Sequence, residues 1–252
     1  MLLSAERITK DFNGVRALNH LDCSVEEGYI HGLIGPNGSG KTTLLNVITG
    51  VSPATEGRIL FEGRDISTSK PYAISRLGIS RTFQRGFVAP SMTCLENVMS
   101  GAHARTKADL FGTFLRIPLT TSKQESQIKE RAIECLSFVG LDKYKDRWAE
   151  ELVWVERQLL QMARALAAEP KLMLLDEPTA GMGPEESVRL AEMIKRILGM
   201  GITIILVSHD MKLVIGLAHR ITAINSGRKI CEGTPESVQK DPRVLEAYLG
   251  KE

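Results

Sequence analysis

Short apolar segments alternate with segments of helical periodicity near both ends of the chain. Residues 29–35 form an apolar run that ends in glycine, and residues 42–49 follow with the pattern of a helix that stops at a glycine. Residues 172–175 and 202–207 are continuously apolar and are bounded by charge or glycine, which predicts buried strands. Between them, residues 184–199 carry apolar positions at helical spacing. The strand–helix–strand order predicts a parallel sheet.

The middle of the chain has a different pattern. Residues 85–165 are helix-prone and charged, and they lack a clear buried strand. We therefore expect a single domain over residues 1–252, in which residues 1–84 and 166–252 form an α/β core and residues 85–165 form an inserted helical subdomain.

Composition excludes several classes of protein. A content of 43% hydrophobic and 25% charged residues is typical of globular proteins and excludes disordered and collagen-like chains. With 32 Lys and Arg against 30 Asp and Glu, the net charge is only +2, so nucleic acid is not an expected partner. The four cysteines form no C-x-x-C pair, which favours reduced thiols over a disulfide or zinc framework.

The start of the chain and its apolar runs bear on location. Residues 1–12 contain Glu6, Arg7, Lys10 and Asp11, whereas a signal peptide needs an unbroken apolar stretch. No run approaches the roughly 18 apolar residues of a membrane span. We expect a chain that stays in the compartment where it is made, so that any membrane role depends on partner proteins.

A glycine-rich motif follows the first apolar run. Residues 35–42 read Gly-Pro-Asn-Gly-Ser-Gly-Lys-Thr, which satisfies the pattern G-x-x-x-x-G-K-[ST]. Glycines let backbone N–H groups approach phosphates closely, and the N-terminus of the following helix favours an anion. We expect Lys41 to reach the β- and γ-phosphates and the Thr42 hydroxyl to bind Mg²⁺. The motif predicts a nucleoside triphosphate site.

Acidic and imidazole side chains follow the two later apolar runs. Asp176 suits Mg²⁺ coordination, and Glu177 suits polarising the water that attacks the γ-phosphate. His209 follows the last run, and ligands collect at the carboxyl ends of parallel strands. We expect these three side chains to belong to the phosphate site.

With these motifs in order, the chain resembles the ATP-binding subunits of ABC transporters from Leu3 to Gly250. The resemblance implies that Phe12 stacks on adenine, that Gln84 of the Q-loop senses Mg²⁺ and the γ-phosphate, and that His209 is the switch histidine. It also implies that the catalytic residues are Glu177, His209 and Gln84, and that Thr42, Gln84 and Asp176 hold the metal. The nucleotide-binding loop, Walker A, would comprise Gly35, Pro36, Asn37, Gly38, Ser39, Gly40, Lys41, Thr42 and Thr43.

The resemblance also implies a fold, a function and partners. The fold would be the P-loop NTPase fold of ABC ATPases, with an N-terminal antiparallel β part and an inserted helical subdomain. The function would be ATP hydrolysis, with ATP and Mg²⁺, coupled to solute import. Partners would be a second ATPase subunit, in a homodimer or a heterodimer, transmembrane permease subunits and, indirectly, a solute-binding receptor. The chain would lie peripherally on the cytoplasmic face of the inner membrane.

Within that family the chain looks most like the branched-chain amino-acid uptake branch. The similarity rests on residues 81–84, 208–212 and 241–250, and on a segment at 101–118 that resembles the extra segment of that branch. Apolar residues in that segment fit one helix face, which either packs internally or contacts membrane subunits: Leu110, Phe111, Phe114 and Leu115. ATPases for urea and other amides are closely similar, so they remain an alternative.

Two elements depart from the family pattern. The signature, L-S-G-G-Q or in this branch a variant such as L-S-Y-G-E, falls at residues 152–156, where Val153, Trp154, Val155 and Glu156 follow the leucine. Val153 takes the place of the serine, and Val155 that of the second glycine. In the D-loop, Gly183 stands where the family has Asp or Asn. The family offers both elements to the nucleotide of the partner subunit.

This departure suggests an asymmetric heterodimer. The chain's own nucleotide would be hydrolysed with the partner's signature, whereas the partner's nucleotide would face a degenerate one; the alternative is sequence drift without consequence. A regulatory subunit that binds ATP without turnover is another interpretation, which Glu177 and His209 oppose and Val153 and Val155 favour. ABC-type ATPases of DNA repair or translation need coiled coils or a second cassette, for which 252 residues leave no room. No acceptor site supports a kinase.

Overall fold

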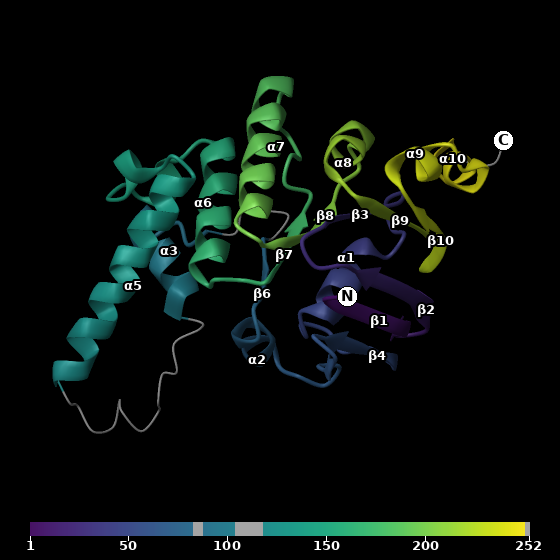
Figure 1. Ribbon diagram of the computed structural model, residues 1–252, viewed down its shortest axis with the longest axis horizontal. Helices are drawn as coiled ribbons and strands as arrows, with labels where there is room; N and C mark the ends of the chain where they lie inside the picture. Colours follow the sequence, from purple (N-terminus) through teal and green to yellow (C-terminus); the bar gives the residue numbers. More distant parts are fainter. Residues whose placement is uncertain (83–87, 104–117, 250–252) are drawn as a thin grey trace. The chain divides into compact units, whose positions relative to one another are not determined.

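The chain divides into two compact units in the computed structural model, which describes residues 1–82, 88–103 and 118–249. Unit 1 comprises Met1–Ile74 and Lys171–Glu252, and unit 2 comprises Ser75–Pro170. Figure 1 shows the elements of each unit. Among the helices of the described residues, none has both the length and the apolar character that crossing a membrane requires.

Unit 1 combines two sheets with flanking helices. Its elements before the insertion are β1 (Leu3–Phe12), β2 (Val15–Val25), β3 (Ile30–Ile34), α1 (Lys41–Ile48), β4 (Glu56–Phe61), β5 (Arg64–Asp65) and the start of α2 (Pro71–Arg76). After the insertion come β7 (Leu172–Asp176), α7 (Pro184–Gly199), β8 (Thr203–Val207), α8 (Met211–Leu217), β9 (Arg220–Asn225), β10 (Arg228–Gly233), α9 (Pro235–Gln239) and α10 (Pro242–Leu249).

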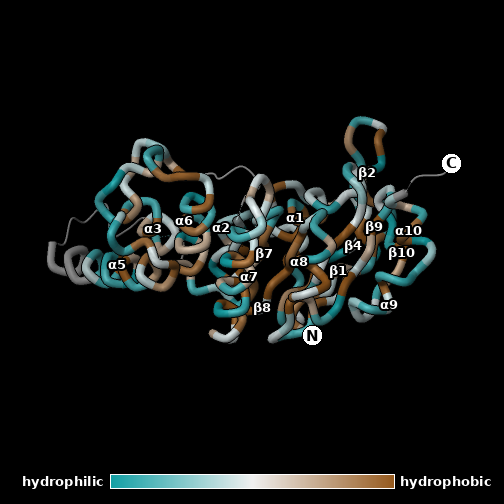
Figure 2. Tube along the Cα trace, turned by 90° about the horizontal axis from the view of Figure 1, so that it is seen from above, coloured by the Kyte–Doolittle hydropathy of each residue, from teal (hydrophilic) through white to brown (hydrophobic). Residues whose placement is uncertain are grey.

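The central sheet of unit 1 is parallel where the sequence predicts it. Its strands follow the order β10-β9-β3-β8-β7, and β3 pairs in parallel with β8 and β9, as β7 does with β8. Every residue of β3, β7 and β8 is buried, because α7 and α8 cover one face and α1 lies on the other (Figure 1). Strands covered on both faces are continuously apolar, which is the pattern in the sequence. Figure 2 colours the trace by hydropathy and labels β7 and β8.

The N-terminal sheet of unit 1 is antiparallel, in the order β2-β1-β4-β5. Several residues of β1, among them Leu3, Ala5 and Ile8, are buried, so the sheet presents one apolar face to the core. Together the two sheets and the helices confirm the predicted α/β fold with an N-terminal antiparallel part.

Unit 2 is mainly helical in its described residues. It contains β6 (Ile79–Arg81), α3 (Cys94–His103), α5 (Pro118–Phe138), α6 (Trp154–Ala167) and two short 3₁₀ turns, η1 (Asp142–Tyr144) and η2 (Ala149–Glu151). Helices α3, α5 and α6 pack against one another. A side chain at Gly101 of α3 would run into the carbonyl oxygen of Arg164 on α6, so glycine permits this close approach.

A buried histidine lies in the central sheet of unit 1. His31 of β3 is 1% exposed, and its Nε2 lies 2.9 Å from Thr222 Oγ1 and 3.8 Å from Cys23 Sγ. Burial is the main cause that lowers the pKa of His31 to about 4; the charge of Glu232 opposes this effect, and that of Arg220 adds to it. The imidazole is therefore neutral in the folded protein at neutral pH.

This histidine makes stability depend on pH. The unfolded chain takes up a proton on His31 near the ordinary histidine pKa of 6.5, whereas the folded protein does so only near pH 4, so acid stabilises the unfolded state. Between pH 7 and pH 4, the free energy of unfolding of the wild type should fall by about 3 kcal/mol more than that of His31→Gln. Urea titrations across this range measure the difference. Parallel pH profiles for the two proteins would contradict a neutral buried His31.

Candidate nucleotide-binding site

The glycine-rich loop connects β3 to α1, as the sequence predicts. It runs from Gly35 to Gly40, and Lys41, Thr42 and Thr43 form the first turn of α1. A Cβ at Gly35 would collide with the carbonyl oxygen of Ile224, and one at Gly40, where φ is 107°, would lie 2.8 Å from Ala17 O. Only glycine fits these two positions, because the loop turns tightly against β9 and β2.

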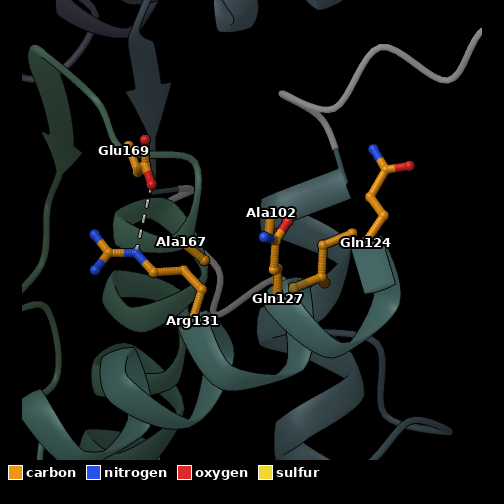
Figure 3. A pocket seen from close by; sticks show the side chains of 7 residues that line it. Ala102, Gln124, Gln127, Arg131, Ala167 and Glu169 are labelled. Atoms are coloured by element: carbon orange, nitrogen blue, oxygen red, sulfur yellow. Dashed lines mark ion pairs between the residues drawn. The ribbon is translucent and has the colours of Figure 1, made fainter. Parts of the chain in front are cut away.

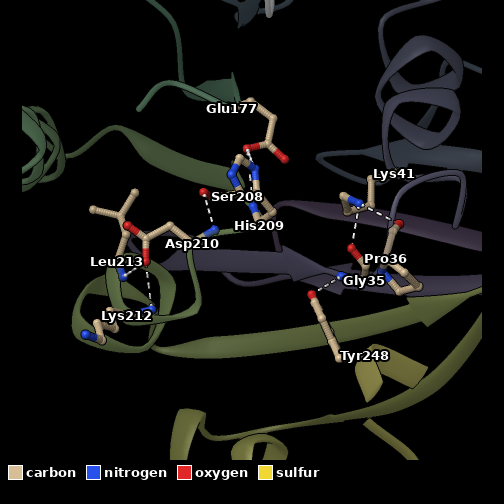
Figure 4. Close-up of polar contacts among 10 residues, drawn as sticks. All are labelled: Gly35, Pro36, Lys41, Glu177, Ser208, His209, Asp210, Lys212, Leu213 and Tyr248. Carbon is tan, nitrogen blue, oxygen red and sulfur yellow. Dashed lines mark hydrogen bonds and ion pairs between the residues drawn. The ribbon is translucent and has the colours of Figure 1, made fainter. Parts of the chain in front are cut away.

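Lys41 directs its ammonium group back into this loop. Its Nζ donates hydrogen bonds to Gly35 O at 2.7 Å and to Pro36 O at 3.0 Å (Figure 4). Burial lowers the pKa of Lys41, and the charges of Glu177 and Asp176 oppose this effect. The positive charge and the two carboxylates therefore act on one another within a single site.

Ser39 adds a hydroxyl to the same loop. The residue is 2% exposed, and its Oγ has no hydrogen-bond partner among the described residues. A buried hydroxyl of this kind is costly unless a ligand or water satisfies it. The loop thus combines a buried polar group, a lysine and space that side chains would fill, which is the donor chemistry that an oligophosphate requires.

The two carboxylates stand at the end of β7. Asp176 and Glu177 are 2% and 6% exposed. Glu177 has a φ of 51°, in the left-handed region, and its N–H donates to Val207 O at 2.9 Å. A non-glycine residue in this region costs roughly 1–3 kcal/mol, and such strain is concentrated at functional sites. The hydrogen bond to β8 therefore holds Glu177 in a strained backbone conformation.

His209 contacts Glu177 directly. Its Nδ1 donates to Glu177 Oε2 at 2.7 Å, and its backbone N–H reaches the same oxygen at 3.2 Å (Figure 4). Asp210 fixes the turn after His209, because its carboxylate accepts hydrogen bonds from the N–H groups of Lys212 and Leu213 and caps α8. The imidazole itself is 64% exposed, so it faces solvent at the mouth of the site.

The structure thus brings four predicted site residues to one edge of the central sheet. Lys41, Asp176, Glu177 and His209 come from the carboxyl ends of β3, β7 and β8, where parallel sheets bind ligands. Asn37 and Gly38 lie in the loop beside them. Phe12 ends β1, is 44% exposed and has Lys10 Nζ 4.9 Å from its ring centroid. Gln84 and the apolar face at 110–115 lie outside the described residues.

The degenerate signature lies at the start of α6 in unit 2. Val153 is the N-cap residue, and no side chain of serine type is there to accept a hydrogen bond from the first turn. Glu156 instead accepts a hydrogen bond from the Val153 N–H at 3.1 Å. Val153 and Trp154 are 60% and 38% exposed. The segment therefore presents apolar side chains and a carboxylate.

The departure in the D-loop has a similar local geometry. Gly183 is the N-cap residue of α7, and Glu186 accepts a hydrogen bond from its N–H at 3.0 Å. Glycine offers no side chain of its own at this position.

Sequence reasoning missed one residue of the site. Tyr248 of α10 accepts a hydrogen bond from the Gly35 N–H at 2.8 Å (Figure 4). In the sequence, residues 241–250 indicate only a resemblance to one branch of a family, and no local pattern connects Tyr248 to the phosphate loop.

Unit 2 contains a separate pocket of about 260 Å³ (Figure 3). Arg131 lines it, but Glu134 at 3.1 Å and Glu169 at 3.9 Å offset the charge of this arginine. The other lining residues are Ala102, Gln124, Gln127, Ile128 and Ala167. The pocket lacks the phosphate-binding groups of the first site.

The α/β core, the loop between β3 and α1 and the acidic end of β7 define a P-loop nucleotide-binding protein. The family model described as "ABC transporter" matches residues 18–180, and the chain belongs to this family. It is an ABC-type ATPase. A second model, "Branched-chain amino acid ATP-binding cassette transporter", matches residues 228–252.

Individual relatives agree with this assignment. The high-affinity branched-chain amino acid transport ATP-binding protein LivG of Salmonella typhimurium is 36% identical over 99% of this chain and 98% of its own length. A probable LivG of Archaeoglobus fulgidus is 38% identical over 99% of this chain and 95% of its own length. The crystal structure of an ATP-binding cassette of an ABC transporter in its ADP conformation is 35% identical, with a TM-score of 0.86 and 99% of each chain covered.

The geometry of Lys41 predicts a loss of nucleotide binding on its removal. Lys41→Ala should weaken ADP binding by about 10- to 100-fold, because a charge-assisted hydrogen bond to the phosphates is lost. Isothermal titration calorimetry measures this. Lys171→Ala is the matched control, since Lys171 pairs with Glu62 on the exposed surface of the same unit. Equal ADP affinity of both variants would show that the phosphates bind elsewhere.

Proposed function

We propose that this chain is the ATP-hydrolysing subunit of an ABC importer for branched-chain amino acids or a similar small solute. One observation supports the hydrolytic part most strongly: Glu177 and His209 are 2.7 Å apart at the strand edge where Lys41 enters the phosphate loop. A carboxylate held by an imidazole beside bound phosphates suits activation of a water molecule.

Each residue has a role in this proposal. Gly35 to Thr43 hold the phosphates, with Lys41 on the β- and γ-phosphates, and Phe12 stacks on adenine. Glu177 accepts the proton of the attacking water, and His209 orients Glu177 and contacts the γ-phosphate. The contact with His209 keeps the carboxylate in place before the nucleotide arrives.

Mg²⁺ fits the oxygen groups of the site. Thr42 offers a hydroxyl and Asp176 a carboxylate, and Gln84 is the third proposed ligand. Within the described residues no group of three or more His, Cys, Asp or Glu side chains could hold a metal. Mg²⁺ is usually bound through one or two carboxylates and keeps several waters, and Asp176 offers one carboxylate. Bound there, the ion would neutralise charge on the phosphates.

The solute and the direction of transport rest on the relatives. The names of the similar proteins and the match over residues 228–252 support branched-chain amino acids, and urea or other amides are the alternative. In this proposal, transmembrane permease subunits carry the solute, which a solute-binding receptor supplies. The chain would act on the cytoplasmic face of the membrane, as one domain with a core of residues 1–84 and 166–252 and a helical subdomain of residues 85–165.

ATP hydrolysis by the purified chain, alone and mixed with its cognate second ATPase subunit, tests the proposal. In the chain alone, Glu177→Gln should reduce turnover by about 100-fold or more, because a general base contributes roughly 10²–10⁴-fold. A phosphate-release assay measures the rate. Turnover of the chain alone that survives this substitution would contradict the role of Glu177.

A second candidate function is that of a subunit in a heterodimer in which one of the two nucleotide sites does not hydrolyse ATP. The inactive site would be the one where the partner's nucleotide faces the signature of this chain. The start of α6 supports it, because Val153 has no hydroxyl and Glu156 turns its carboxylate onto the N–H of that residue. A γ-phosphate on the partner subunit would meet apolar side chains and a negative charge there. The loss of a preorganised donor set typically costs roughly 10²–10³-fold in rate.

The double substitution Val153→Ser and Val155→Gly restores the family's residues at both positions. In the assembled transporter it should raise total ATP turnover by up to about twofold, because a second site then hydrolyses at a comparable rate while the first is unchanged. Adding Glu177→Gln to the double variant isolates the restored site. Identical turnover before and after restoration would mean that the signature residues carry no asymmetry.

A further inference from the structure

A hydrogen bond joins the last helix of the chain to the first glycine of the phosphate loop. The Gly35 N–H donates to Tyr248 Oη at 2.8 Å, although the two residues are 213 positions apart in the sequence. Figure 4 shows the phenol of Tyr248 directed at Gly35, next to Pro36 and Lys41. The C-terminal helix α10 therefore reaches the nucleotide site through one hydroxyl.

The backbone N–H of Gly35 needs the Tyr248 hydroxyl as an acceptor because Gly35 lies just beyond the end of β3. The parallel ladder of β3 with β9 ends at Ile34, so the next N–H group lies beyond the strand pairing. The two polar backbone groups of Gly35 then find side-chain partners: Tyr248 for the N–H and Lys41 for the carbonyl oxygen. A backbone N–H inside the protein that loses its partner destabilises the conformation that holds it.

Helix α10 presents the hydroxyl from a fixed position. Asp241 precedes the helix, accepts a hydrogen bond from the Arg243 N–H at 2.9 Å and pairs with the guanidinium of Arg243 at 2.7 Å. Val244 is 2% exposed, and α10 packs on β10 and α9. The hydroxyl is therefore part of a packed element rather than of a free tail.

The phenol shares its surroundings with the predicted catalytic groups. Burial raises the pKa of Tyr248; the hydrogen bond with Gly35 lowers it, and the charge of Glu177 raises it. Tyr248 is thus a neutral hydroxyl at neutral pH, which can accept from Gly35 and still carry its own proton.

We propose that Tyr248 is a positioning residue for nucleotide binding, which holds Gly35 in place while Lys41 exchanges the Gly35 carbonyl for a phosphate oxygen. The inference rests on the proposed phosphate site. When a nucleotide enters, Lys41 leaves the carbonyl oxygens of Gly35 and Pro36. The bond from the Gly35 N–H to Tyr248 remains, and it keeps Gly35 in its binding conformation. Without this bond, the free-energy cost of reordering the loop would reduce the affinity for the nucleotide.

Tyr248→Phe tests this role, since it keeps the ring and removes only the hydroxyl. ADP affinity measured by calorimetry should fall on the order of tenfold, which corresponds to about 1.4 kcal/mol. Tyr29→Phe is the matched control, because Tyr29 is a half-exposed tyrosine of unit 1 that packs on His219. This control should bind ADP as the wild type does.

Hydrogen exchange distinguishes a positioning role of Tyr248 from a merely structural one, because a merely structural role would not change the effect of ADP on amide exchange. In the wild type, ADP should slow amide exchange in residues 242–249, because the nucleotide stabilises the loop conformation that Tyr248 contacts. In Tyr248→Phe this ADP-dependent protection should disappear, while circular dichroism shows a folded protein.

The outcomes separate the two proposals when Lys41→Ala is titrated alongside. If Lys41→Ala loses ADP binding while Tyr248→Phe binds as tightly as the wild type, only the role of Tyr248 is overturned, even if its melting temperature has fallen. If both variants bind ADP as the wild type does, the phosphate site itself is wrong, and the inference fails with it. Weakened binding in both variants, with Tyr29→Phe unchanged, supports both.

Discussion

The ammonium group of Lys41 lies inside a tight loop, where the carbonyl oxygens of Gly35 and Pro36 hold it at 2.7 and 3.0 Å. A buried lysine of this kind needs acceptors, and backbone carbonyls can supply them only if the chain turns around the side chain. That requirement explains the glycines at 35 and 40, whose neighbours leave no room for a Cβ. This loop joins the end of β3 to the start of α1. The loop, the strand and the helix therefore form one unit around a single charge.

The two carboxylates at the end of β7 balance that charge. Asp176 and Glu177 are almost fully buried, and they counteract the effect of burial on the pKa of Lys41. Glu177 takes a left-handed backbone conformation that β8 and His209 hold in place. Such an arrangement is unfavourable as packing alone, because burying carboxylates costs free energy unless cations or hydrogen bonds compensate. A cation held together with nucleotide phosphates, as proposed above, would offset this cost.

The sequence indicates which residues meet at this edge of the sheet because the determinants are local. The spacing of Gly35, Lys41 and Thr42 and the continuously apolar strands before Asp176 and His209 are readable over a few residues. The contact of Tyr248 with Gly35 and that of His31 with Thr222 are not, since 213 and 191 residues separate the partners. Neither tyrosine nor histidine has a local pattern that marks its partner. The bond from the Val153 N–H to Glu156 depends on where α6 begins, which a degenerate motif does not reveal.

A crystal structure of the protein with ADP and Mg²⁺ tests the central claim most directly. The account predicts that Lys41 Nζ leaves the carbonyl oxygens of Gly35 and Pro36 and lies within hydrogen-bond distance of the β-phosphate, while residues 35–40 keep their backbone course. Glu177 should remain next to His209. If Lys41 keeps both carbonyl contacts while ADP occupies another part of the protein, the site described above does not bind the nucleotide.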